Sequence, residues 1–531
     1  MFLYNNIKDL TFNDLLILII LIITFKILFF FSGFIQEDAF IMFRAAFNFA
    51  EYGNFSYNLD DSRSATTSKI FGLICSLLKV IFKEYAIYSI TIFNSIISFL
   101  SSLVIFISLK ELFNYNNKIF SRNDIFFLVV VTFLNPSISI ISIAGLEFSI
   151  LVLFMSLVLF GVIKDNKVLL SLVFFIPVIR IELIGFVLIF SFLYLYFLKW
   201  KTSLIILIFG IFGLLFNIYL NNMFDGGLIP TTAISKLSIS SISNSFSLDR
   251  VIIDLNHWFF GERSFFLGII SKFIPKFIYT FSGILVLIYS FYNFKYLMIN
   301  KFNNLNYKQK IFLISISASI IFLPLSYVIS GVVWDWYLYP YSFLTYALIA
   351  IFLLNLKNSY KIKNIFVILI FTITIFQFLV LKNIGFQENS YRSVVGKDIF
   401  DLSKNPREDT LFLEPAGYIP YIAKIKTFDT EGLTSQEIFK FRNKNNKRWW
   451  LDFIEENRPT FIVDRKNIYD GFSHDGKYSL SETEITWFKQ NYDLVKKYNY
   501  HKFVNEYSGI FKKFYLLGDH SDYFLYKKTI N

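Results

Sequence analysis

Apolar runs dominate the first 384 residues of the chain, and many approach or reach the roughly 20 residues that an α-helix needs to cross a bilayer. Hydrophobic residues make up 55% of the chain and aromatic residues 20%, which exceeds the composition of a soluble globular protein. We therefore predict a mainly α fold, a multi-pass membrane protein with about 11 transmembrane helices. The predicted crossings are residues 13–34, 86–109, 124–142, 146–163, 167–180, 183–198, 202–221, 264–291, 311–330, 334–356 and 363–383.

Charged residues return after residue 384, and the apolar runs become short. The predicted strands there are residues 410–413, 424–428 and 460–463, and the predicted helices include residues 449–457 and 481–492. Short strands that alternate with helices indicate a small α/β domain. We therefore divide the chain into a polytopic transmembrane domain, residues 1–384, and a soluble α/β domain, residues 385–531.

The formal net charge of +12 suggests nucleic-acid binding at first sight, but its distribution argues against it. Residues 385–531 hold 23 basic and 21 acidic residues, so 28 basic and 18 acidic residues precede them. The excess positive charge therefore lies in the membrane half, where cytoplasmic loops explain it, and we predict no nucleic-acid partner. Cys75 is the only cysteine, which excludes an intrachain disulfide.

The short apolar segment at residues 69–82 decides the predicted topology. It is only about one short helix long, so we expect it to be re-entrant or to lie on the membrane surface. The basic loops downstream then all face the cytoplasm, as the positive-inside rule requires. This predicts an integral protein of the cytoplasmic membrane with a cytoplasmic N-terminus, an extracytoplasmic C-terminal domain, and large outer loops at residues 35–68 and 222–262.

The first outer loop begins with an amphipathic stretch. On a helical wheel Glu37, Arg44, Asn48 and Glu51 fall on one stripe opposite a phenylalanine-rich face, which predicts an interfacial helix over residues 38–52. Gly53 follows at the position where a left-handed glycine commonly ends a helix. The two acids that open the helix, Glu37 and Asp38, could simply complement the helix dipole.

Residues 37–68 contain two acids followed by Ala-Phe-Ile, then Phe43-Arg44, Asn48, Gly53, Asn58 and Thr67-Ser68. This pattern resembles the first external loop of GT-C glycosyltransferases, polytopic enzymes that use polyprenyl-phosphate-linked sugars. The nearest branch contains the cell-wall terminal arabinofuranosyltransferases. Its loop opens with two aspartates and ends in Tyr-Thr-Ser-Pro-Leu-Trp, whereas this chain has Glu37 first and Thr-Thr-Ser-Lys-Ile-Phe at residues 66–71.

Further short blocks resemble elements of the same family, and their order along the chain strengthens the resemblance. They are residues 145–147 (family Gly-Met-Glu-Thr), 178–183 (Thr-Arg-Pro-Glu-Gly), 226–236 (Leu-Pro-Asn-Thr-x-x-Ala-Lys), 334–337 (an aromatic Asp-Trp-Tyr element), 416–421, and 429–433 (Asp-x-x-Gly-Leu). The chain lacks the proline and glycine of the second block. The resemblance therefore extends over most of the sequence in scattered pieces.

The resemblance implies a membrane glycosyltransferase that moves a sugar, with inversion, from a polyprenyl-phosphate donor to a glycan, lipid or protein acceptor at the outer face. Asp38 and Glu37 are the candidate bases. The implied donor-phosphate ligands are Arg44, Lys236 and Arg180, and the implied substrate-binding residues are Asn48, Glu147, Glu182, Thr232, Asp335, Trp336 and Tyr337. Membrane lipids are the other expected partners, and neither a cofactor nor a metal ion is predicted.

Several alternatives stay open at this point. Glu37 shares a stripe with Arg44 and could be held in an ion pair, which favours Asp38 as the base, whereas the family's usual first aspartate favours Glu37. Arg180 could mark a break between two short helices, Glu147 a helix start, and residues 334–337 an aromatic belt.

A different class of protein, a polytopic transporter or a lipid or oligosaccharide flippase, would use intramembrane charges along its substrate path. It predicts inverted repeats, which the sequence does not show. A membrane scaffold without enzymatic activity would leave the acidic first loop unexplained. The sequence also lacks a P-loop and a GxGxxG element, which argues against a nucleotide-sugar donor.

Overall fold

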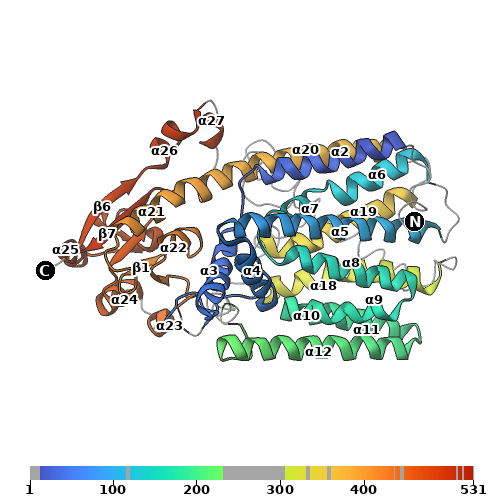
Figure 1. The fold of residues 1–531 in the computed structure, drawn as a ribbon, viewed down its shortest axis with the longest axis horizontal. Coiled ribbons are helices and arrows are strands. Elements are labelled where there is room, and N and C mark those ends of the chain that lie inside the picture. The colour runs from blue at the N-terminus through green and yellow to red at the C-terminus, as the bar shows by residue number, and fades with distance from the viewer. Residues whose placement is uncertain are drawn as a thin grey trace. The chain divides into compact units, whose positions relative to one another are not determined.

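The protein is described by a computed structural model, which is mainly helical and ends in an α/β region (Figure 1). The described residues are 12–61, 63–114, 120–230, 232, 305–330, 335–355, 360–435, 437–442, 448–509, 512–516 and 520–529. The chain forms two compact units. The first comprises Met1–Ser32, Ile87–Tyr219 and Ser240–Val380, and the second comprises Gly33–Ala86, Leu220–Ile239 and Leu381–Asn531.

The first unit consists of helices whose axes run roughly parallel in Figure 1. They are α2 (Phe12–Phe30), α5 (Ala86–Asn114), α6 (Arg122–Phe133), α7 (Pro136–Ile141), α8 (Phe148–Lys164), α9 (Lys167–Ser171), α10 (Phe175–Ile179), α11 (Ile184–Tyr196), α12 (Trp200–Asp225), α18 (Tyr307–Ser330), α19 (Tyr339–Asn355) and α20 (Tyr360–Gly385). The last residues of α12 and α20, from Leu220 and Leu381 onward, belong to the second unit. Helical structure occurs in every predicted crossing that the structure describes, and residues 264–291 lie outside it. The predicted crossing at 124–142 is two helices, because Asn135 caps α7 and Pro136 begins it.

Three helical stretches in the described residues are long and apolar enough to cross a membrane. They are Lys69–Phe113, Trp200–Asp225 and Tyr360–Leu402. Five other apolar helices have only 10–17 residues, which is short of the roughly 20 that a bilayer requires. Three of the five end at a change in backbone conformation: Phe148–Lys164 ends before the left-handed Asp165, Lys167–Ile179 before the extended Arg180, and Ile181–Tyr196 shortly before the left-handed Leu198. Helix length therefore supports three crossings and does not support the predicted number of eleven.

The second unit contains a five-stranded mixed sheet with the order β2-β1-β3-β7-β6. The strands are β1 (Thr410–Leu413), β2 (Lys426–Asp429), β3 (Phe461–Asp464), β6 (Tyr492–Tyr498) and β7 (Tyr523–Lys528), and β4 (Phe472–Ser473) pairs with β5 (Tyr478–Ser479) in a separate hairpin. Strands β1, β2 and β3 are parallel, whereas β7 is antiparallel to both of its neighbours. The predicted C-terminal α/β region and its first three strands are confirmed. Strands β6 and β7 were not predicted.

Both faces of this sheet are covered. On one face Leu411 and Leu413 pack with Val395 and Ile399, and on the other Phe412 packs in a cluster of aromatic residues. The α/β helices are α21 (Arg392–Leu402), α22 (Tyr418–Ala423), α23 (Glu437–Arg442), α24 (Trp449–Asn457), α25 (Glu482–Asn491), α26 (Tyr500–Tyr507) and α27 (Lys512–Tyr515). Because successive residues of β1 and β3 alternate between two buried faces, these two strands are apolar almost throughout.

Helices α3 (Glu37–Tyr52) and α4 (Lys69–Phe82) also belong to the second unit. The predicted helix over residues 38–52 is confirmed, and Gly53 ends it with a φ of 73°. Lys83, with a φ of 50°, separates α4 from α5, so the short helix predicted at residues 69–82 exists. Its placement at a membrane surface stays a prediction, as does the domain boundary at residue 384.

Candidate functional site

The carboxylate of Glu37 lies at the start of α3 and accepts three hydrogen bonds. Arg392 Nη1 donates to Glu37 Oε2 at 2.6 Å, and the backbone N–H groups of Gly417 and Tyr418 donate to Oε1 at 2.9 and 2.8 Å. Glu37 is therefore held in an ion pair, as its place on the charged stripe suggested. Its partner is Arg392 and not Arg44, because the Arg44 guanidinium has other acceptors.

Gly417 makes this contact possible. A Cβ atom at this position would lie 2.2 Å from the backbone oxygen of Glu37 and 2.6 Å from its Oε1. Real Cβ atoms do not approach other atoms this closely, so α3 would have to move to admit any side chain. The glycine of the 416–421 block thus allows the backbone after β1 to meet the first turn of α3.

Arg44 is the centre of a second set of contacts, between α3 and the segment leading into β2. Its Nε donates to Tyr57 O at 2.8 Å, Nη1 to Pro420 O at 3.0 Å, and Nη2 to Ile425 O at 2.7 Å. Longer hydrogen bonds run from Arg44 to Thr427 Oγ1 and Asn58 Oδ1, so all five N–H groups of the guanidinium have an acceptor. The structure therefore gives Arg44 a structural role, and we do not retain it as a phosphate ligand.

The loop after α3 is fixed to the edge of the sheet. Asn58 donates from Nδ2 to Thr427 O and accepts from Thr427 N–H, both at 3.0 Å, so it pairs with an edge strand much as another strand would. The hydroxyl of Tyr57 donates to Ala416 O at 2.6 Å. Asn48, predicted to bind substrate, donates to Ser56 O at 2.8 Å and also holds this loop.

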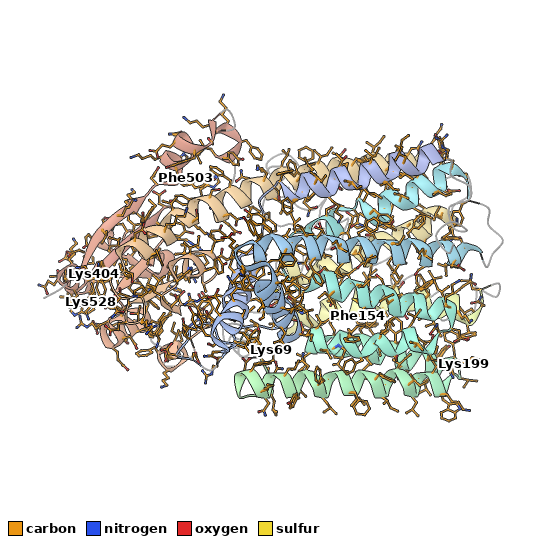
Figure 2. The ribbon with its side chains drawn as sticks, viewed as in Figure 1. Lys69, Phe154, Lys199, Lys404, Phe503 and Lys528 are labelled. Atoms are coloured by element: carbon orange, nitrogen blue, oxygen red, sulfur yellow. The ribbon has the colours of Figure 1, made fainter. Side chains whose placement is uncertain are left out.

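The end of the first loop is joined to the end of α12 by a buried ion pair. Lys69 Nζ donates to Asp225 Oδ2 at 2.7 Å, and the side chains are 1% and 0% exposed. The N–H and hydroxyl of Ser64 donate to Asp225 Oδ1 at 2.9 and 2.7 Å. Figure 2 labels Lys69 at the start of α4. Sequence reasoning missed this pair, although Lys69 departs from the family's proline and Asp225 directly precedes the 226–236 block.

The remaining predicted residues of the second unit are only partly described. Asp38 is half-buried in the first turn of α3, where the helix dipole favours a negative charge. Thr232 is buried, and its hydroxyl has no hydrogen-bond partner among the described atoms. Lys236 lies outside the described residues.

A separate cluster in the first unit brings together three of the predicted blocks. Arg180 donates from Nη1 to Glu147 Oε1 at 2.9 Å and from Nε to Glu182 Oε1 at 2.6 Å. Its guanidinium carbon lies 4.3 Å from the ring centre of Tyr337, a cation–π distance. Arg180 and Glu147 are buried, and Glu182 is about one third exposed.

Local backbone geometry explains this cluster. Arg180 is extended between α10 and a short 3-10 helix (Ile181–Leu183), and Glu147 occupies the N-cap position of α8 just after the left-handed Gly145. Both of the structural alternatives predicted for these residues, a helix break and a helix start, are therefore confirmed. Asp335 and Trp336 belong to the 3-10 helix Asp335–Leu338, and their side chains lie outside the description.

The 429–433 block forms a turn after β2. The buried Asp429 carboxylate accepts from the N–H groups of Leu433 and Thr434 at 2.8 and 2.7 Å. Glu431 is paired with Lys477 at 3.3 Å and Arg442 at 3.4 Å. Burial alone would raise the pKa of Glu431, but Lys477 and Arg442 hold the pKa below its ordinary value of 4.5.

This lowered pKa predicts an acid-dependent loss of stability. Because the folded state favours the ionised Glu431, its contribution is complete above pH 4.5 and is lost as the pH falls through the lowered pKa. We expect Glu431→Gln to lower the melting temperature at pH 7, through a loss on the order of 1 kcal/mol, and to have little effect in acid. Thermal unfolding across pH measures this, with the exposed Glu456→Gln as control. An effect that is the same at every pH would contradict the pairing.

Comparison with known proteins finds a family match for the C-terminal region. A family model described as Domain of unknown function (DUF8728) matches residues 383–525, from the end of α20 into β7. No curated protein matches the chain. Fold and contacts thus define a mainly helical protein. Its described residues include three helices long and apolar enough to cross a membrane, and its C-terminal α/β region resembles a domain family of unknown function.

Proposed function

We propose that this protein is a membrane glycosyltransferase that moves a sugar from a polyprenyl-phosphate donor to a glycan, lipid or protein acceptor at the outer face of the membrane. Asp38 is the proposed base. The proposal keeps the predicted orientation, with the N-terminus in the cytoplasm and the α/β region outside. It also keeps the multi-pass arrangement, in which the shorter apolar helices cross as well.

One observation carries the proposal: blocks that resemble GT-C glycosyltransferases, and that are far apart in the sequence, are in contact. In the second unit the first-loop acids meet the 416–421 block through Glu37 and Gly417, 380 residues apart. In the first unit Arg180 joins Glu147 and also lies against Tyr337. Structural roles explain individual contacts, but they do not explain why segments that resemble one family are in contact within each unit.

The proposed reaction is a single displacement at the anomeric carbon. The acceptor oxygen forms a new bond to that carbon while the bond to the lipid phosphate breaks, which inverts the configuration. Asp38 takes the proton of the acceptor hydroxyl, and polyprenyl phosphate leaves with the bonding electron pair. General-base assistance of this kind contributes about 10² to 10⁴-fold. A positive side chain stabilises the leaving phosphate, and we assign this role to Lys236.

Radiolabelled sugar transfer by the purified protein tests this proposal. Membranes from a strain lacking the gene supply the acceptor, and the donor is either a polyprenyl-phosphate sugar or the matching nucleotide sugar. We expect label to reach the acceptor from the lipid donor alone, because the lipid phosphate already activates the sugar. Transfer from the nucleotide sugar with no lipid-linked sugar donor present would contradict the mechanism. Movement of intact lipid-linked sugar across liposomes, with no bond broken, would instead identify a flippase.

A further inference from the structure

The α/β region contacts α3 just after strand β1, at a position where such folds usually bind a ligand. In open α/β sheets, ligands occupy the crevice outside the carboxyl ends of the parallel strands. Here the backbone that leaves the carboxyl end of β1 directs the N–H groups of Gly417 and Tyr418 to a carboxylate of the same chain, Glu37. A protein side chain thus occupies the position after β1.

Arg392 completes this contact from the other side. It follows a six-residue π-helical segment (Phe386–Tyr391) that joins α20 to α21, and such segments often mark functional positions. Tyr523 in β7 orients the side chain, since Arg392 Nε donates to the tyrosine hydroxyl at 3.0 Å. The hydrogen bond to the sheet therefore fixes the guanidinium in the orientation in which Nη1 lies 2.6 Å from Glu37 Oε2.

Glu37 is adjacent in sequence to Asp38, so whatever fixes Glu37 also fixes the first turn of α3. Both carboxylate oxygens of Glu37 are used, at 2.6 to 2.9 Å, and its side chain is 12% exposed. A base must take a proton from the acceptor, but the oxygens of Glu37 already accept hydrogen bonds from fixed donors. Its geometry suits an anchor better than a base.

We infer that Glu37, Arg392 and Gly417 form a latch by which the C-terminal α/β region positions Asp38 for catalysis. Glu37 and Arg392 are then positioning residues. The part of the chain that matches the domain family, residues 383–525, is a scaffold for the catalytic loop. This inference rests on the proposed function for its catalytic consequence. The latch itself is a structural statement that can be tested without any activity.

The kinetic test compares Glu37→Gln, Arg392→Gln and Gly417→Ala with the wild type, using the full chain and the polyprenyl-phosphate donor. A small misplacement of a reacting group costs roughly 10 to 100-fold in rate, so we expect kcat to fall by that amount with little change in KM. Gly417→Ala removes no polar group, so its loss would report displacement alone. Arg392→Lys, which keeps the charge, should recover part of the rate, and the exposed Arg407→Gln serves as control.

The pH–rate profile separates positioning from catalysis. If Glu37 only positions Asp38, Glu37→Gln lowers the rate but keeps the acidic limb of the profile at the same apparent pKa. Loss of that limb in Glu37→Gln would overturn the inference, because Glu37 would then be the base. Unchanged kcat in all three variants would overturn it as well.

Hydrogen exchange distinguishes failure of the latch from failure of the proposed function. We expect faster amide exchange at residues 417–418 and in the first turn of α3 in Arg392→Gln and Gly417→Ala, because opening of the latch exposes these N–H groups. If the wild type transferred no sugar but exchange were faster in the variants, the proposed function would be contradicted and the latch would be supported. Unchanged exchange in both variants would overturn the latch whatever the activity.

Discussion

Asp38→Asn is expected to lower sugar transfer by about 10² to 10⁴-fold, the contribution of a general base, while the protein stays folded. The amide keeps the size of the side chain but cannot take the acceptor proton. Asp38 lies half-buried in the first turn of α3, beside a carboxylate that is already bound by three donors. The rate is measured with the polyprenyl-phosphate donor at matched protein levels.

Two variants control this experiment. Asp401→Asn changes an exposed carboxylate of α21 and should leave the rate unchanged. Glu37→Gln should reduce transfer less than Asp38→Asn does, because it disturbs the position of the base without removing it. A larger loss in Glu37→Gln than in Asp38→Asn would reassign the base to Glu37, in line with the first aspartate of the family that the loop resembles.

Local sequence patterns predicted the elements whose own residues carry a clear hydrophobic period. Strand β1 and helix α24 have the predicted bounds, Thr410–Leu413 and Trp449–Asn457, because each is a short apolar run or an amphipathic period between polar segments. Strand β6 gave no such signal, since its five central residues are exposed and include Lys496 and Lys497. Its pairing with β7 is what makes it a strand.

The candidate site shows the limit of sequence reasoning more sharply. Helical periodicity correctly placed Glu37 and Arg44 on one stripe of α3, but it could not identify their partners. Arg392 is 355 residues from Glu37, and Ile425 is 381 residues from Arg44. Such contacts depend on which segments the fold brings together, and no local pattern encodes that. Neither Arg392 nor Ile425 lies in one of the family-like blocks, so the resemblance did not indicate these partners either.

Asp225→Asn is expected to lower the melting temperature on the order of 10 °C, the larger of the two stability effects predicted here. Lys69 and Asp225 are almost completely inaccessible to solvent, at 1% and 0% exposure. Removal of one partner from a buried pair costs about 3 to 5 kcal/mol, because the other charge stays buried without compensation. For a unit of this size each kcal/mol corresponds to roughly 2 to 4 °C.

The double variant Lys69→Met/Asp225→Asn distinguishes this cause from general disruption. It leaves no buried charge, and the asparagine oxygen can still accept from the N–H and hydroxyl of Ser64. We therefore expect it to melt above Asp225→Asn, which makes the two substitutions non-additive. Asp60→Asn removes an exposed ion pair with Lys426 in the same unit and should change the melting temperature little. The melting temperatures are measured in detergent. If Asp225→Asn melted at the same temperature as Asp60→Asn, the Lys69–Asp225 pair would contribute little to stability and would not fix the end of the first loop.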